Sequence, residues 1–266
     1  DPHGATARRF PARRFPQALR TCAEDGSLAY TNFSYRRHSP ITRLRQRLRL
    51  GRHWADVQVL GTHPLVQQFD AIHPELLRAE LRSGPVQPFP VQALGADSLR
   101  QLARSFCELV GFQPQSIGAG SVLITISHSS YARRNPSYLK QIQGCAARLQ
   151  AGALPFYFKY HPRESETDYA GLGMHGSERE IPRTLPVECL YILARDTPLL
   201  VIGGMSTSLL TAGLLMRHVR SAALVDATSA GDAWDDRLLD ALKITPLADE
   251  AALWRYLDGW RADAQT

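Results

Sequence analysis

The feature that most constrains the fold is an uninterrupted apolar run, Val122-Leu123-Ile124-Thr125-Ile126, followed by a helix-forming segment. A β-branched run of this kind is typical of a strand that is buried on both faces, as in a parallel sheet. From about residue 115 onward, apolar strands and helical patterns alternate along the chain. This alternation predicts a doubly wound α/β domain, in which ligands bind at the carboxyl ends of the strands.

Several further elements are expected around this strand. Helices are predicted at 97–110, 136–151, 207–220 and 249–262, strands at 57–60, 154–160 and 222–225, and apolar stretches at 190–194 and 199–202. Residues 41–50 alternate apolar and basic side chains, which fits either a strand or a short basic helix. Residues 84–90 are rich in proline and are expected to form a connector.

Positive charge is concentrated at the start of the chain. Residues 1–52 hold twelve arginines and three acids, a balance of +9, although the whole chain carries only +6. Such a segment suits a polyanion, which could be an anionic membrane, an anionic glycan or nucleic acid, or it is a solvated arginine-rich face. Nucleic acid is the least favoured partner, because no known binding motif accompanies the charge. The arginines concerned are Arg36, Arg37, Arg43, Arg45, Arg47 and Arg49.

Composition narrows the class of protein. No apolar run approaches the roughly 20 residues that span a bilayer, and no apolar leader opens the chain. We therefore expect a cytoplasmic globular protein, with peripheral contact to the inner face of the membrane through residues 36–52. The four cysteines are scattered without CxxC spacing, so buried thiols are expected rather than a zinc site.

His161 follows a predicted strand directly, in the run Lys159-Tyr160-His161-Pro162. Proline after histidine favours an extended backbone at the histidine. At the end of a strand this side chain could donate a proton or hydrogen bond to a departing phosphate, whereas alone it would be an ordinary surface histidine.

Gly203-Gly204-Met205-Ser206-Thr207-Ser208 joins a predicted strand to a predicted helix. Backbone N–H groups at a helix N-terminus bind anions, and hydroxyls add donors. Ser206 or Thr207 could simply cap the helix, but three consecutive hydroxyls exceed that need, so a phosphate site is favoured. The chain has neither a Walker pattern nor GxGxxG, which argues against a kinase or a dinucleotide enzyme.

Acidic residues supply two more candidates. Glu188 precedes an apolar stretch, where a carboxylate could accept hydrogen bonds from a ribose diol or stabilise a helix start. Glu24-Asp25-Gly26 is either a turn or the position of a general base for a sugar hydroxyl.

Taken in order, Glu24-Asp25-Gly26, His161-Pro162 and Ser206-Thr207-Ser208 resemble the D/E-D/E-G, HP and serine/threonine motifs of bacterial polysialyltransferases and lipooligosaccharide sialyltransferases. The resemblance runs from about residue 22 to about 215. It implies a GT-B architecture of two Rossmann-like domains and inverting transfer of sialic acid from CMP-sialic acid to a glycan or glycolipid. It also implies a bacterial enzyme of capsule or lipooligosaccharide synthesis.

The resemblance assigns roles to individual residues. Asp25 would be the base, His161 would assist the CMP phosphate, and Glu188 would hold the ribose. Lys159 and the hydroxyls of Ser206 to Ser208 would complete the nucleotide site, with no cofactor and no metal.

Composition, the alternation of elements and the resemblance together predict a domain division. Residues 1–20 would be a basic arm rich in proline and arginine, 21–114 a reduced N-terminal acceptor-side domain, and 115–266 the CMP-sugar-binding domain. Only 23 residues precede Glu24, so the N-terminal α/β domain is expected to be truncated or reduced.

Three alternatives stay open: a CMP-Kdo-dependent transferase, a non-catalytic nucleotide-binding module, and a polyanion-binding adaptor that uses the arginines.

Overall fold

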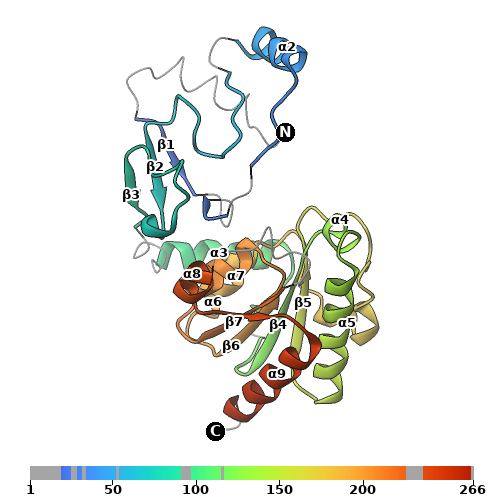
Figure 1. Ribbon diagram of the computed structural model, residues 1–266. Helices are drawn as coiled ribbons and strands as arrows, with labels where there is room; N and C mark the ends of the chain where they lie inside the picture. The colour runs from blue at the N-terminus through green and yellow to red at the C-terminus, as the bar shows by residue number, and fades with distance from the viewer. Residues whose placement is uncertain are drawn as a thin grey trace. The chain divides into compact units, whose positions relative to one another are not determined.

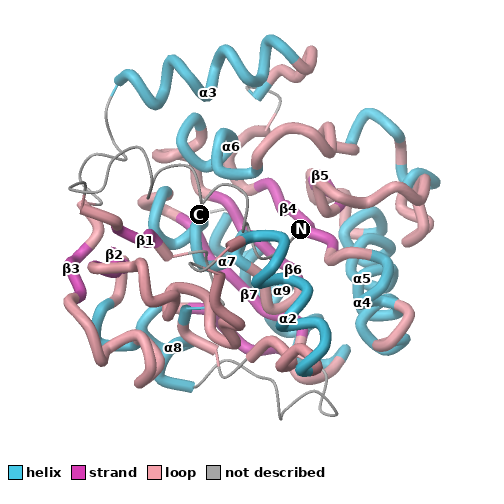
Figure 2. Tube along the Cα trace, turned by 90° about the horizontal axis from the view of Figure 1, so that it is seen from above, coloured by secondary structure: helices cyan, strands magenta, loops and turns pink. Residues whose placement is uncertain are grey.

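The computed structural model describes residues 19–24, 29–31, 34–51, 54–90, 97–114, 117–225 and 236–264. The chain divides into two compact units, Asp1–Pro90 and Val91–Thr266. Helix α3, which the sequence places in the first domain, belongs to the second unit because it packs against α6 (Figure 2).

The first unit contains a small parallel sheet. Its strands β1 (Thr21–Ala23), β2 (Gln68–Ala71) and β3 (Val86–Pro88) lie in that order. A 3₁₀ turn, η2 (Pro74–Leu76), follows β2, and a helix, α2 (Pro40–Leu50), lies between β1 and β2 in sequence. The first unit therefore combines a helix with a parallel sheet.

The second unit is built on a five-stranded parallel sheet (Figure 1). The strand order is β5-β4-β6-β7-β8. The strands are β4 (Ser121–Ile126), β5 (Phe156–Tyr160), β6 (Leu199–Gly203), β7 (Val219–Leu224) and β8 (Ile244–Leu247). The helices are α3 (Asp97–Leu109), α4 (Ser129–Ala132), α5 (Pro136–Ala151), α6 (Val187–Leu193), α7 (Thr207–Leu215), α8 (Asp236–Leu242) and α9 (Glu250–Ala264), with 3₁₀ turns η5 (Gly173–His175) and η6 (Ser177–Arg179).

Helices cover both faces of this sheet, as the unbroken apolar strand predicts. Every residue of β4 is buried. Its even-numbered side chains Val122, Ile124 and Ile126 join a core with α5 and α9. Helices α6 and α7 contact each other, and α7 packs on β6 and β7. The predicted α/β architecture with a doubly wound parallel sheet is confirmed at this level.

A rudiment of one more strand lies beyond β5. Glu180 forms an isolated parallel bridge with Phe158, and Ile181 donates its N–H to the Phe158 carbonyl at 2.8 Å. With this bridge counted, the strands follow the 3-2-1-4-5-6 order of dinucleotide-binding domains. With or without this bridge, the strand order reverses direction between β4 and β6.

Some local predictions need correction. Residues 57–60 form a turn rather than a strand, since Thr62 donates both its N–H and its hydroxyl to the Val59 carbonyl. The proline-rich connector at 84–90 contains β3. The helix predicted to reach Arg220 ends at Leu215, because Arg220 pairs with Leu200 inside the sheet.

Cys107, Cys145 and Cys189 are buried and Cys22 is partly buried, and none of these four described cysteines forms a disulfide. Among the described residues, no helix combines the length and the apolar character needed to cross a bilayer.

Candidate functional site

The ends of three neighbouring strands lie level at one edge of the sheet. Tyr160, the last residue of β5, pairs with Ile126, the last residue of β4. Gly203, the last residue of β6, pairs with Thr125. The loops after β5, β4 and β6 therefore begin side by side, at the point where the winding reverses and where open α/β sheets bind ligands.

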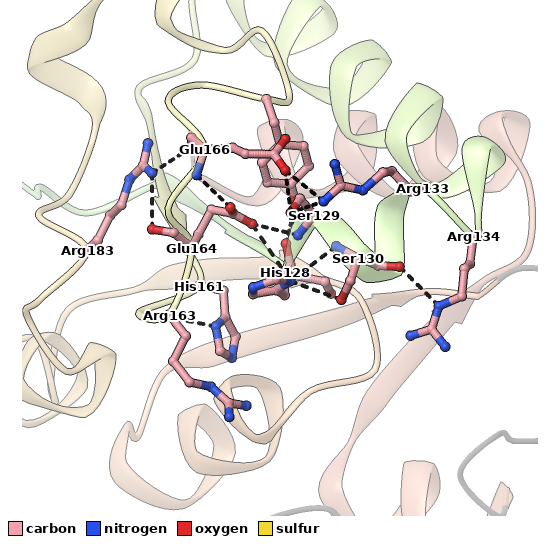
Figure 3. A network of polar contacts seen from close by, with 12 residues as sticks. His128, Ser129, Ser130, Arg133, Arg134, His161, Arg163, Glu164, Glu166 and Arg183 are labelled. Carbon is pink, nitrogen blue, oxygen red and sulfur yellow. Dashed lines mark hydrogen bonds and ion pairs between the residues drawn. The ribbon is translucent and has the colours of Figure 1, made fainter. Parts of the chain in front are cut away.

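Two histidines meet at this edge (Figure 3). His128 follows β4, His161 follows β5, and their ring centroids are 5.6 Å apart in an edge-to-face arrangement. Each ring accepts a backbone N–H at Nδ1: His128 from Ser130 and His161 from Arg163, both at 3.1 Å. A neutral imidazole held in this way carries its proton on Nε2, where it can donate to a ligand.

The environment keeps His161 uncharged at neutral pH. Burial lowers the pKa of this imidazole, and the positive charges of Arg163 and Lys159 and the neighbouring His128 lower it further. Glu164 opposes the change without reversing it. His161 is therefore suited to donate a hydrogen bond through Nε2–H rather than to act as a charged imidazolium acid.

Glu164 joins the loops that carry the two histidines. Its side chain is 1% exposed and accepts the N–H of Ser129 at 2.6 Å and the N–H of Glu166 at 2.8 Å. Burial alone would raise the pKa of Glu164, but these hydrogen bonds outweigh it and lower the pKa to about 2. Its Oε2 also lies 4.0 Å from His128 Nδ1. The ionised carboxylate thus fixes one loop against the other.

Two arginines reinforce this junction from outside. Arg133 donates to Ser129 Oγ at 3.1 Å and lies 2.7 Å from the Glu166 carboxylate. Arg183 donates to the Glu166 carbonyl at 2.7 Å. Both guanidinium groups already donate to acceptors within this network, so their role is to hold the two loops in position (Figure 3).

A second polar cluster lies on the sheet face away from α5 and α9. Thr125 of β4 and Lys159 of β5 are register partners, and both alternate with side chains of the apolar core. Ser208 donates to Thr125 Oγ1 at 3.2 Å, and Ser206 Oγ lies 2.7 Å from Ser208 Oγ. Thr207 is exposed, so the first and third hydroxyls of the trio belong to this cluster.

Ser206 occupies the N-cap of α7, but its side chain makes no capping hydrogen bond. Its hydroxyl turns to Ser208 instead. Helix capping therefore does not account for this hydroxyl, and the first backbone N–H groups of α7 stay without a side-chain cap from the N-cap residue.

Lys159 carries a buried amine on the same face of the sheet as Thr125. The residue is 5% exposed, and Nζ donates to the carbonyls of Tyr160 at 3.3 Å and Arg183 at 3.2 Å. Burial lowers its pKa to about 8, with Glu188 opposing and Arg183 adding to the effect. Glu188, in the first turn of α6, accepts the hydroxyl of Thr211 from α7 at 3.3 Å. Lysine and glutamate therefore interact electrostatically next to the α6–α7 contact.

Two glycines let β4 and β6, and the loops that follow them, approach closely. A Cβ on Gly203 would lie 2.2 Å from Thr125 Oγ1, and one on Gly204 would lie 2.9 Å from Ser127 Oγ. Ser127 is held by two tyrosines: its N–H donates to Tyr138 OH at 3.0 Å, and Tyr169 OH donates to its carbonyl. Side chains at 203 and 204 would force these loops apart.

The predicted base, Asp25, lies outside the described residues. Its neighbour Glu24 accepts the N–H of Ile72 at 2.7 Å and the hydroxyl of Tyr30 at Oε2. Glu24 Oε1 is buried without a hydrogen-bond partner in the described structure. Burial raises the pKa of Glu24, although these hydrogen bonds oppose the rise. Glu24 thus ties the end of β1 to the residue that follows β2.

Sequence patterns gave no role to His128, Glu164 or Thr125. The signal for His128 was present, because Ser127-His128-Ser129-Ser130 follows the most apolar strand directly. No sequence signal marks Glu164, because its role depends on a contact with a loop 35 residues away in sequence.

A groove of about 830 Å³ lies at the opposite edge of the sheet, where Ala119 precedes β4 and Pro198 precedes β6. The histidines and hydroxyls described above do not line it. The described residues contain no group of three or more His, Cys, Asp or Glu side chains arranged for a metal ion. The carboxyl edge, with its donors and one buried amine, is the part suited to an anion.

No family model, curated protein or solved structure matches the chain.

Proposed function

We propose that the chain is a GT-B-like glycosyltransferase that moves sialic acid from CMP-sialic acid to a glycan or glycolipid acceptor. The observation that carries the proposal is the juxtaposition of strand ends: His161, Ser206 and Ser208 follow β5 and β6, with β4 between those strands. Donors from both loops thus gather where a nucleotide phosphate binds in open α/β sheets.

Each residue of the candidate site has one role in the proposed transfer. The Ser206 and Ser208 hydroxyls and the N-terminus of α7 bind the phosphate of CMP. His161 donates its Nε2–H to a phosphate oxygen as the bond to the sugar breaks and its electron pair passes to that phosphate. Glu188 accepts the ribose hydroxyls, with Lys159 balancing its charge. Asp25 takes the proton of the acceptor hydroxyl that attacks the anomeric carbon, so the configuration inverts.

The smaller parallel sheet of the first unit supports a reduced acceptor-side domain. The scheme uses no cofactor and no metal. A CMP-Kdo transferase would need the same phosphate and cytidine contacts, and donor hydrolysis measured with both CMP-sugars separates the two.

Isothermal titration with CMP, UMP and AMP tests the nucleotide site. We expect selective binding of CMP, weakened about tenfold by Ser208→Ala, since a hydrogen bond to a charged group is lost. Ser105→Ala, on the exposed side of α3, is the matched control and leaves the affinity unchanged.

His161→Ala tests the reaction in the same preparations. Transfer from CMP-sialic acid falls by roughly 10², the usual contribution of a positioned proton or hydrogen-bond donor, while CMP affinity is largely kept. Equal binding of all three nucleotides argues against the cytidine site. CMP binding without turnover in the unmodified chain supports the non-catalytic module instead.

A further inference from the structure

Helix α2 has no buried residue. Ser39 caps its start by accepting the Thr42 N–H at 3.2 Å, and Gly51, at φ 86°, ends it. The apolar side chains Ile41, Leu44 and Leu48 are 68%, 60% and 78% exposed. Spacings of three and four residues put all three on one side of the helix. A folded, capped helix therefore presents a narrow apolar strip to the solvent.

Arginines flank this strip on both sides. At 100° per residue, Arg45 and Arg47 lie nearest to the strip on its two sides, and Arg49 and Arg43 lie farther round the helix. All four are exposed. Residues 34–51 contain no aspartate or glutamate, and Arg36 and Arg37 precede the helix. The exposed apolar strip on α3 is different, since Asp97 and Glu108 belong to that helix.

We propose that α2 binds the surface of an anionic lipid bilayer. Its leucines and isoleucine would enter the boundary between headgroups and acyl chains, with the helix axis parallel to the membrane plane. Arginine side chains on both borders can then extend to lipid phosphates while their aliphatic parts stay apolar. At 11 residues the helix is about 16 Å long, which suits lying on a bilayer and is too short to cross one.

The apolar strip favours a membrane over a soluble polyanion. Nucleic acid or an anionic glycan would contact the arginines, but it would leave three exposed aliphatic side chains without a role. A bilayer uses both features of the same helix. This inference stands apart from the proposed transferase activity, since it rests on α2 alone.

Co-sedimentation of the full chain with vesicles tests it. We expect binding to phosphatidylcholine vesicles containing about a quarter phosphatidylglycerol, and little binding to phosphatidylcholine alone. Leu44→Ser with Leu48→Ser weakens binding at least about tenfold, as does Arg45→Gln with Arg47→Gln, because each pair reduces one of the two contributions. Leu102→Ser with Leu109→Ser, on the α3 strip, is the matched control and keeps full binding.

Retention on heparin separates the two partner classes. The leucine variant should elute with the unmodified chain, and the arginine variant should elute earlier. If the leucine variant binds vesicles as tightly as the unmodified chain, the arginines recognise charge alone and the membrane proposal fails. Circular dichroism confirms that each variant remains folded.

Discussion

Lys159 carries the most unusual charge of the site. A buried ammonium is costly, and here two carbonyl oxygens and the charge of Glu188 only partly compensate, so its pKa falls to about 8. The protonated form adds positive potential on the face of the sheet that also carries Thr125. An anion bound there favours the protonated form, and its affinity therefore declines when the proton leaves.

CMP affinity should reflect this titration. We expect a nearly constant Kd around pH 7 and a weakening of about tenfold as pH rises through about 8, the value given by the lowered pKa of Lys159. Lys159→Met, of similar length, should give the weak affinity at every pH. Titration calorimetry in a series of buffers measures both, and an unmodified chain whose Kd stays flat to pH 9.5 would remove Lys159 from the site.

At the scale of elements, strong local patterns predicted the structure well. Strand β4 and helix α5 were predicted within one residue of their observed ends, because their apolar pattern is unbroken. The pattern at 41–50 fitted both a strand and a helix, and the cap at Ser39 with Pro40 in the first turn favours the helix. Residues 57–60 failed as a strand because strand formation needs a neighbouring partner, which composition does not reveal.

For the candidate site, too, the sequence predicts local features but not the contacts between loops. His161, Ser206 and Ser208 were picked out because they come directly after predicted strands, a purely local signal. Their positions relative to Thr125, His128 and Glu164 depend on strand order and register. Those are properties of the folded sheet, so the hydrogen bonds between loops could not be read from the residues alone.

Gly203 sets the spacing between β4 and β6. Gly203→Ala brings a methyl group to 2.2 Å from Thr125 Oγ1 and 2.7 Å from the Thr125 carbonyl, so the strands must separate. We expect a loss of about 1–3 kcal/mol, typical of overpacking, and a lower melting temperature. Thermal unfolding followed by circular dichroism measures it.

Gly259→Ala is the matched control for this substitution. Nothing lies within 4 Å of a Cβ at that position in α9, so alanine should stabilise the helix by about 0.5–1 kcal/mol. A Gly203→Ala protein as stable as this control would show that β4 and β6 tolerate the extra width.

At the scale of the whole molecule, the two compact units differ in charge. Residues 1–90 hold 14 basic and 7 acidic residues, a balance of +7, whereas residues 91–266 hold 17 basic and 18 acidic residues, a balance of −1. The polar clusters at the sheet edge all belong to the second unit. The proposed nucleotide site and the proposed membrane contact therefore belong to different units of the chain.

The fragment 91–266 tests this division. We expect it to unfold cooperatively and to bind CMP within about threefold of the full chain, because the five-stranded sheet and its core lie within it. It should show no sugar transfer and no vesicle binding, since Asp25 and α2 are absent. A fragment that unfolds without a cooperative transition would mean that the second unit depends on the first.

Because β4, β5 and β6 end level with one another, the site depends on the register in which these strands pair. Successive side chains of a strand point to opposite faces, so deleting one residue of β5 ahead of Lys159 would move Lys159 to the position of Phe158 and Tyr160 to the position of Lys159. An ammonium would enter the core beneath α5, and a phenol ring would face Thr125. A substitution leaves each side chain on its face of the sheet, whereas inserting or deleting one residue within a strand moves the residues beyond it to the opposite face. Changes in length should therefore be confined to the connecting loops.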